Sequence, residues 1–334
     1  MDILVKSFNR PYYLERCLRS IELQIQGDHQ VKVLDDGTPA PYLDRIQALF
    51  PNVQILKSPE YAQKAQAIAE AAAGSKPFSA FSIPTHFWIE NVQQATDTFF
   101  LFEDDFWMTR PVLLSEVASL MVKENLLLLK TYWGQNNLLM RGGKRSLTDN
   151  IEQYIPKIPF LVDFLFHNRL KSQSILYHLK LFTVTNRFVI SIYDLYSVAS
   201  AFYRKDYWLF LWQNAAPGRV NETLQLLQAT QWKRDRTGGY ARFKQDASNT
   251  SYITSATNTY PDVDLDIFRF NHLMNEAWLK GGFDAMEGYP ADIPLTTFEK
   301  VLTDAKDPGA SPSEWLKWVS RFRDQYAGFG YTVA

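Results

Sequence analysis

Short apolar runs alternate with amphipathic segments over the first third of this 334-residue chain. The intervening segments repeat apolar residues at the spacing of one helix face, and the first opens at Asn9-Arg10-Pro11, where a proline suits the first helical turn. Strand-like runs are found at 2–8, 31–34, 53–56 and 98–102, and helical segments follow Pro11, lie near 41–50 and cover about 60–73. This β-α-β-α-β order predicts an α/β fold with a mostly parallel sheet and helices on both faces.

The pattern is less regular after residue 110. It predicts a loop over 141–146, one or two helices within 151–182, an aromatic segment over 198–212, a capped helix over 219–232 and a final amphipathic helix over 313–322. Between 141 and 187 there are eight Lys or Arg and three Asp or Glu, so this stretch is locally basic.

Composition narrows the class of protein. Apolar residues make up 46% and aromatic residues 15%, which is ample for a large core, and the net charge of −1 gives no field that favours nucleic acid. Cys17 is the only cysteine, which excludes an internal disulfide and a thiolate zinc cluster. No signal-peptide pattern and no long apolar window are found, so we expect a soluble protein of the cytoplasm.

Polar clusters follow three of the predicted strands. They read Ser-Phe-Asn-Arg after the first strand, Asp-Asp-Gly-Thr after the second and Glu-Asp-Asp after the run at 98–102. In parallel sheets ligands bind at the carboxyl ends of the strands. The three clusters are therefore expected to converge on one binding edge.

The three adjacent acids Glu103, Asp104 and Asp105 need compensation. At an effective dielectric constant of about 20, two carboxylates about 5 Å apart repel by roughly 3 kcal/mol. Arg110 is the basic residue close in sequence, and hard carboxylate oxygens suit Mg²⁺ or Mn²⁺. Because alternate residues of an extended chain point the same way, a metal would be held by Glu103 and Asp105. The alternative is that the acids cap a following helix or are solvated.

The ordered set of motifs resembles the N-terminal half of GT-A glycosyltransferases of the family 2 type. The similarity covers about the first 110 residues, in the stretches ILVKSFNRPYYLERCLRSI, VKVLDDGTP and TDTFFLFEDDFWMTRP. It implies a Rossmann-like GT-A fold in a single domain, 1–334. In that domain 1–110 would bind nucleotide and metal, and 111–334 would supply acceptor binding and catalysis, with a helical insertion at about 141–187.

The resemblance assigns roles to individual residues. Phe8 would stack on the nucleotide base, with Ser7 and Asn9 beside it, and Asp36, preceded by Asp35, would accept from the base N–H. Ordinary packing for Phe8, a helix cap for Asn9 and a simple turn at Asp35-Asp36-Gly37 are the alternatives. The motif Glu103-Asp104-Asp105 would bind Mn²⁺ or Mg²⁺, with Asp105 as the direct ligand. The segment 58–74 lacks the family's usual Gly and Arg-Asn, and Lys64 is the only basic side chain on its helix.

The implied reaction is sugar transfer from a nucleotide-diphosphate sugar to a carbohydrate or lipid-linked acceptor. If configuration inverts, a carboxylate must deprotonate the acceptor hydroxyl. Glu222 follows the aromatic segment in the expected order and is our candidate, with Asp206 and Asp246 as alternatives. Simple dipole compensation at a helix start would also explain Glu222.

The aromatic segment offers stacking surfaces for an acceptor, although core packing is the alternative. The candidates are Tyr203, Tyr207, Trp208 and Trp212. The basic segment 151–182 could contact the inner face of a membrane through Phe160, Phe164, Phe166 and Leu170, or form a flap with its lysines in water, the reading we favour.

Two other functions compete with the transferase. A sugar nucleotidyltransferase would open with a Gly-rich basic loop, and the segment KSFNRP has no glycine. A catalytically degenerate relative that binds carbohydrate or protein is the non-enzymatic alternative.

Overall fold

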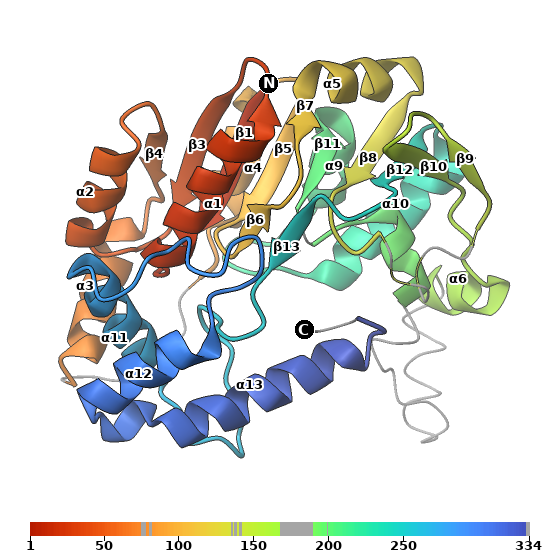
Figure 1. The fold of residues 1–334 in the computed structure, drawn as a ribbon. Helices are drawn as coiled ribbons and strands as arrows, with labels where there is room; N and C mark the ends of the chain where they lie inside the picture. The colour runs from red at the N-terminus through yellow and green to blue at the C-terminus, as the bar shows by residue number, and fades with distance from the viewer. Residues whose placement is uncertain are drawn as a thin grey trace, which may run out of the picture.

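The computed structural model describes residues 1–74, 78–79, 82–134, 136, 139, 142–167, 190–198 and 200–331. Within these residues one nine-stranded sheet crosses the molecule (Figure 1). Its strands, in spatial order, are β4 (Gln54–Lys57), β3 (Gln30–Asp35), β1 (Asp2–Ser7), β5 (Thr98–Glu103), β11 (Ala201–Arg204), β8 (Leu126–Lys130), β12 (Gly239–Phe243), β10 (Ile151–Tyr154) and β9 (Lys144–Ser146).

The first four strands of this order are parallel, as the sequence predicts. β11 runs antiparallel to both of its neighbours, β8 and β12 are parallel to each other, and β10 is antiparallel to β12 and β9. Two small ladders pair β2 (Ile25–Gln26) with β7 (Val112–Leu113), and β6 (Phe106–Met108) with β13 (Ser248–Thr250).

Alternation along the strands divides the core into two layers. Ile3 and Val5 face one side of the sheet and Leu4 faces the other, since successive side chains of a strand point to opposite faces. The first side is covered by α1 (Pro11–Gln24), α2 (Ala40–Leu49) and α5 (Leu114–Lys123), and by residues of α11 (Ile267–Leu279), α12 (Leu295–Ala305) and α13 (Pro312–Ala327). The second side is covered by α4 (Thr85–Gln94), α9 (Lys205–Trp212) and α10 (Glu222–Asp235). Helices on both faces confirm the predicted α/β class.

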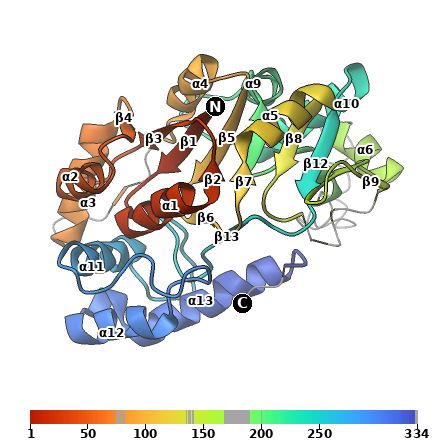
Figure 2. The same ribbon diagram turned by 45° about the horizontal axis from the view of Figure 1, so that its top comes forward.

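The C-terminal helices lie along one edge of the molecule. Figures 1 and 2 show α11, α12 and α13 below the sheet, with the C-terminus returning toward its centre. The remaining elements are α3 (Tyr61–Ala72), α6 (Phe160–His167) and two short 3₁₀ helices, η1 (Ile190–Leu195) and η2 (Pro308–Ala310).

Some predicted elements are corrected. Residues 144–146, expected in a loop, form the edge strand β9, and 151–154, expected in a helix, form β10. The helix of this region is α6, and the rest of the predicted helical segment, 168–182, lies outside the described residues. The predicted capped helix is α10, and Asn221 accepts from Leu224 N as its N-cap. Among the described residues no helix is long and apolar enough to cross a membrane.

Candidate functional site

Three cavities lie in sequence from the carboxyl ends of β1, β3 and β5, and each shares lining residues with the next. The largest, about 670 Å³, includes Ser7, Phe8, Asp36, Glu103 and Asp104 in its wall, and we call it the strand-end cavity. The sequence-predicted clusters after the three strands therefore meet at one edge of the sheet. This convergence arises because parallel strands end on the same side.

Asn9 and Asp35 do not line the strand-end cavity, and hydrogen bonds tie both residues to the loops around it. Asn9 is buried with φ 54°, and its amide oxygen accepts from Asn275 Nδ2 at 3.1 Å. Asp35 accepts from the backbone N–H of Gly37 and Thr38 at 3.0 and 2.8 Å. Both residues shape the loops that present Phe8 and Asp36.

Asp36 pairs with a buried lysine. Lys64 Nζ lies 2.6 Å from Asp36 Oδ2 and donates to Ser82 O as well. Asp36 Oδ1 and the Ser58 hydroxyl are both buried without a hydrogen bond of regular geometry, although Ser58 is close enough to lower the pKa of Asp36. Burial raises the pKa of Asp36, while Lys64 opposes the rise. Asp36 itself lines the cavity, and its Oδ1 is an acceptor with unused hydrogen-bonding capacity.

Gly37 makes the close approach of α3 possible. It has φ +137°, and a Cβ there would lie 2.6 Å from Lys64 Cβ. The Asp-Asp-Gly sequence thus brings Lys64 against Asp36.

Aromatic rings form one wall of the strand-end cavity. Phe8 is half-buried and its ring centroid lies 6.2 Å from that of Phe78, which stacks on Phe268 of α11 at 3.9 Å. Trp88 of α4 also faces the cavity, with Lys6 Nζ 4.7 Å from its ring centroid. These rings offer flat surfaces on which a planar ligand group can stack.

The three acids are compensated by cations from the first strand and the loop after it. Lys6 Nζ lies 2.5 Å from Glu103 Oε1, Arg10 Nη2 lies 2.5 Å from Asp104 Oδ1 and Arg10 Nη1 lies 2.9 Å from Asp105 Oδ2. Arg110 is the basic residue near the acids in sequence, but these observed partners lie over 90 positions away and the sequence argument did not find them. Burial raises the pKa of Asp104 to about 7 against the opposing charge of Arg10.

The acids divide between two cavities. Asp104 faces the strand-end cavity and accepts from Phe8 N at 2.9 Å, whereas Asp105 faces a second cavity of about 80 Å³, and Glu103 lines both. We call this second space the acid cavity. Asp104 and Asp105 are successive residues in the turn between β5 and β6, and their side chains face different cavities.

A divalent cation fits part of this arrangement. Both oxygens of Asp104 are used, but Asp105 Oδ1 is buried with no hydrogen-bond partner, next to Glu103 in the acid cavity. Within the described ranges no group of three His, Cys, Asp or Glu is placed to hold a metal. Mg²⁺ is commonly held by one or two carboxylates, and substrate phosphates complete its coordination. Glu103 and Asp105 can supply the two carboxylates.

A third cavity of about 160 Å³ holds Glu222 at its mouth, and we call it the aromatic cavity. The Tyr193 hydroxyl donates to Glu222 Oε2 at 2.6 Å. Trp133, Val198 and Tyr326 line both this cavity and the acid cavity. The three spaces therefore form a row of neighbours, in which the first and second share Glu103 and the second and third share these residues.

Asp206 and Asp246, the alternative candidates for the general base, have different environments. Asp206 is exposed, pairs with Arg204 at 2.6 Å and lines a separate surface pocket. Asp246 interacts with the backbone N–H groups of Trp133 and Gly134, and burial raises its pKa to about 6. Neither lines the row of three cavities.

The four aromatic residues considered for acceptor stacking belong to the core. At most 4% of the surface of each is exposed, which corrects that expectation: Tyr203, Tyr207, Trp208 and Trp212. The half-buried rings of the aromatic cavity come instead from elements far apart in sequence, so no local pattern predicted them.

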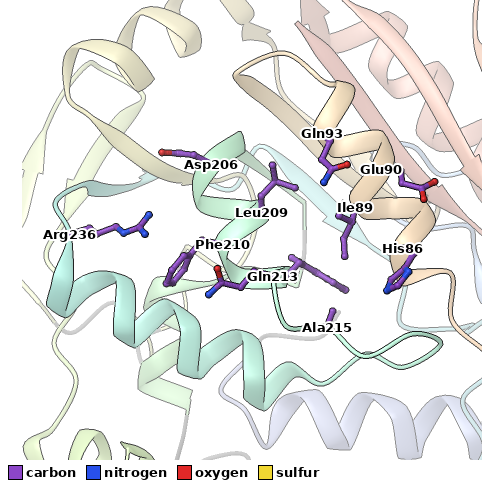
Figure 3. A pocket seen from close by; sticks show the side chains of 11 residues that line it. His86, Ile89, Glu90, Gln93, Asp206, Leu209, Phe210, Gln213, Ala215 and Arg236 are labelled. Carbon is purple, nitrogen blue, oxygen red and sulfur yellow. The ribbon is translucent and has the colours of Figure 1, made fainter.

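A pocket of about 650 Å³ lies apart from the row, between α4 and α9 (Figure 3). Figure 3 shows His86 and Glu90 on one side of it and Phe210 and Arg236 on the other. It shares no lining residue with the three cavities around the acids.

Comparisons with known proteins give distant likenesses of fold. The sequence matches no protein-family model and no curated protein. Among solved structures it is similar to S. aureus TarS 1-349 (12% identity over 99% of this chain and 92% of that one, TM-score 0.42). It is also similar to glucosyl-3-phosphoglycerate synthase from Mycobacterium tuberculosis (12%, 84% and 78%, 0.40) and to the galactosyltransferase LgtC (14%, 69% and 70%, 0.30). With TM-scores below 0.5, the functional assignment rests on the geometry of this chain.

Proposed function

We propose that this protein is a glycosyltransferase of the GT-A type that moves a sugar from a nucleotide-diphosphate sugar to a carbohydrate or lipid-linked acceptor. The observation that carries the proposal is the row of three adjoining cavities. It offers space for a nucleotide, then a pair of acids, then a carboxylate at the mouth of a further cavity. A sugar transferase needs donor, diphosphate and acceptor in that order.

The strand-end cavity would hold the nucleotide. Phe8 would stack on the base, and Asp36 Oδ1, which lacks a partner, would accept a base N–H. Lys64 keeps the Asp36 side chain in place through its 2.6 Å contact with Oδ2.

Glu103 and Asp105 would hold a divalent cation beside the diphosphate. When bound, such a cation neutralises charge on the leaving diphosphate. Arg10 holds the Asp105 side chain through Oδ2 and leaves Oδ1 free. Lys6 lines the strand-end cavity and pairs with Glu103, so it adds a positive charge close to the same region.

Glu222 would act as general base in an inverting transfer. The bond between the anomeric carbon and the diphosphate oxygen breaks and its electron pair leaves with the diphosphate. The acceptor oxygen forms the new bond to the anomeric carbon, and its proton passes to Glu222. The Tyr193 hydrogen bond orients the Glu222 carboxylate.

The nucleotide site is tested by calorimetry with UDP and GDP in the presence of Mn²⁺. Loss of a stacked ring in Phe8→Ala should weaken the preferred nucleotide by about 1–3 kcal/mol, the scale of base stacking. Phe210→Ala is the matched control, because Phe210 is a half-buried ring in the separate pocket of Figure 3. An unchanged dissociation constant in Phe8→Ala would return Phe8 to a packing role.

The role of Glu222 as general base is tested by Glu222→Gln, which keeps size and hydrogen bonding but cannot take a proton. Nucleotide binding should be unchanged and the transfer rate should fall by about 10²–10⁴. Asp206→Asn and Asp246→Asn are the comparison variants. A product that keeps the anomeric configuration of the donor, with all three variants active, would show that the inverting mechanism is wrong.

One observation favours a second candidate, a degenerate carbohydrate- or protein-binding relative. Lys6 and Arg10 place two positive charges against the three acids, so side chains of this protein offset much of their charge. Nucleotide affinity that is the same with Mn²⁺ and with EDTA, together with no transfer activity, would support this candidate.

A further inference from the structure

We propose that the aromatic cavity is the acceptor subsite and that the group it binds is a sugar ring. The inference rests on the proposed function and adds to it the chemical class of the acceptor and the residues that hold it. Its first support is position, since the cavity adjoins the acid cavity through Trp133, Val198 and Tyr326 and has the candidate base Glu222 at its mouth.

The walls of the cavity are aromatic rings that remain partly exposed. Trp133, Tyr193, Tyr326 and Tyr331 are each half-buried, unlike the fully buried rings of the core. The Trp133 ring centroid lies 4.5 Å from that of Tyr331 and 6.3 Å from that of Tyr326. Large aromatic rings that gather around an open hollow are available to pack on a ligand.

Polar groups at the same cavity match the rim of a sugar ring. Glu222, Gln325 and the hydroxyl groups of the tyrosines can exchange hydrogen bonds with ring hydroxyls. Burial and the charge of Glu222 raise the pKa of Tyr193, so its hydroxyl keeps the proton that it donates to Glu222 and can accept from a ring hydroxyl. A hydrocarbon chain would leave these polar groups unpaired, whereas a sugar has both an apolar face and a polar rim.

The cavity wall is held in place before any ligand binds. Asn136 Nδ2 donates to Phe329 O at 2.8 Å, and Tyr260 donates to Gln325 Oε1 at 2.9 Å, which ties the end of α13 and the residues after it to loops of the domain. Trp133 has φ 66°, a left-handed conformation that is an outlier for a bulky residue. Residues in such strained conformations cluster at ligand sites, and they persist only where the surrounding structure holds them in place.

The test measures saturation-transfer difference spectra with methyl glycosides of glucose, galactose, mannose and N-acetylglucosamine, in the presence of UDP and Mn²⁺. At least one glycoside should receive saturation on its ring protons from the wild-type protein. Tyr326→Ala should weaken that glycoside about tenfold, the scale of a lost aromatic contact, and Tyr326→Phe should retain it. Leu316→Ala is the matched control, because Leu316 is an exposed apolar residue on the same helix.

Octyl β-glucoside below its micelle concentration separates a sugar site from a lipid site. Saturation of the ring protons supports the proposal, whereas saturation confined to the octyl chain overturns it. A Tyr326→Ala signal equal to wild type, with normal melting and UDP affinity, also overturns it, as does the absence of any glycoside signal in a protein that binds UDP. Failure of UDP to bind would defeat the proposed function instead, and the glycoside spectra recorded without nucleotide would still decide the cavity.

Discussion

At the scale of single residues, the chemistry of the site depends on how one arginine divides its contacts. Arg10 donates to one oxygen of Asp104 and one of Asp105, and both pairs are largely removed from water. Breaking a buried pair by removing one partner is costly, because it leaves an uncompensated charge. The same pairing explains how three adjacent acids are tolerated, and it leaves Asp105 Oδ1 without a hydrogen-bond partner.

Asp105→Asn should remove the effect of Mn²⁺ on nucleotide affinity. The substitution withdraws the one carboxylate that has a free buried oxygen in the acid cavity, whereas Arg10 keeps its contact with Asp104. Calorimetry with UDP in Mn²⁺ and in EDTA should give two affinities for wild type and a single, weaker one for the variant. Asp97→Asn serves as control, because Asp97 is an exposed acid directly before β5, the strand that leads to Asp105. If the variant responds to Mn²⁺ as wild type does, Asp105 does not hold the cation.

The residues that sequence reasoning missed are those whose partners are distant. Phe8, Asp36 and the acids stand directly after predicted strands, so the topology alone places them at one edge. Arg10 was visible in the Asn-Arg-Pro motif, but its contacts with the acids appear only once β1 and β5 pair. Phe268 approaches from α11 without any local pattern that points to the cavity.

At the scale of elements, local patterning worked where one helix or strand buries one face. α1, α2 and α3 and the first four strands of the sheet were predicted on that basis, within one to three residues of their observed bounds. Residues 151–154 were misassigned because a short Ile-Glu-Gln-Tyr run fits a helix or a strand equally well. Its state is decided by antiparallel pairing with β12 on one side and β9 on the other.

The element α6 carries an exposed apolar face that suits the expectation of contact with a membrane. Phe160 is 81% and Phe164 48% exposed, and their rings stack at 6.2 Å. The side chain of Phe166 and the whole of Leu170, the other two residues of that expectation, lie outside the described residues. Lys157 precedes the helix, so an anionic surface would meet both an apolar and a basic group.

If α6 binds membranes, wild type should sediment with anionic liposomes at low salt and less at physiological salt. The double change Phe160→Ser with Phe164→Ser should reduce pelleting severalfold, because it removes the apolar contact but keeps the charges. Val122→Ser is a suitable control, since Val122 is 80% exposed on α5, away from this helix. If wild type stays in the supernatant at low salt, α6 does not bind anionic membranes.

At the scale of the whole molecule, the two halves differ in how far sequence determines topology. The β-α units of the first 110 residues place each strand beside a neighbour from the same segment, as expected because consecutive elements are usually adjacent in space. In the second half β11 inserts between β5 and β8, and β12 pairs with β8 across more than 100 residues. Such non-local pairings are determined by tertiary packing. The periodicity of apolar residues along one sequence does not reveal them.

The second half of the sheet is also where buried charge should affect the stability of the whole fold. Lys130 and Arg242 lie on the neighbouring strands β8 and β12, both buried, and Asp246 lies within reach of their charges. Burial raises the pKa of Asp246 to about 6 from the ordinary 3.8, against the opposing effect of these cations and of two backbone N–H groups. The folded protein therefore holds a proton on Asp246 that the unfolded chain releases.

The sign of the resulting pH dependence follows from that proton. A carboxyl group with a raised folded-state pKa contributes stability that is fully present below pH 4 and is lost as the pH rises through 6. Between pH 4.5 and 7.5 Asp246 should account for a loss of roughly 2 kcal/mol in the free energy of unfolding. Asp246→Asn is uncharged at every pH, so its urea midpoint should fall by less than that of wild type over this interval. Asp206→Asn, at an exposed acid, should fall as wild type does, and a parallel fall in all three proteins would show that Asp246 does not titrate in this window.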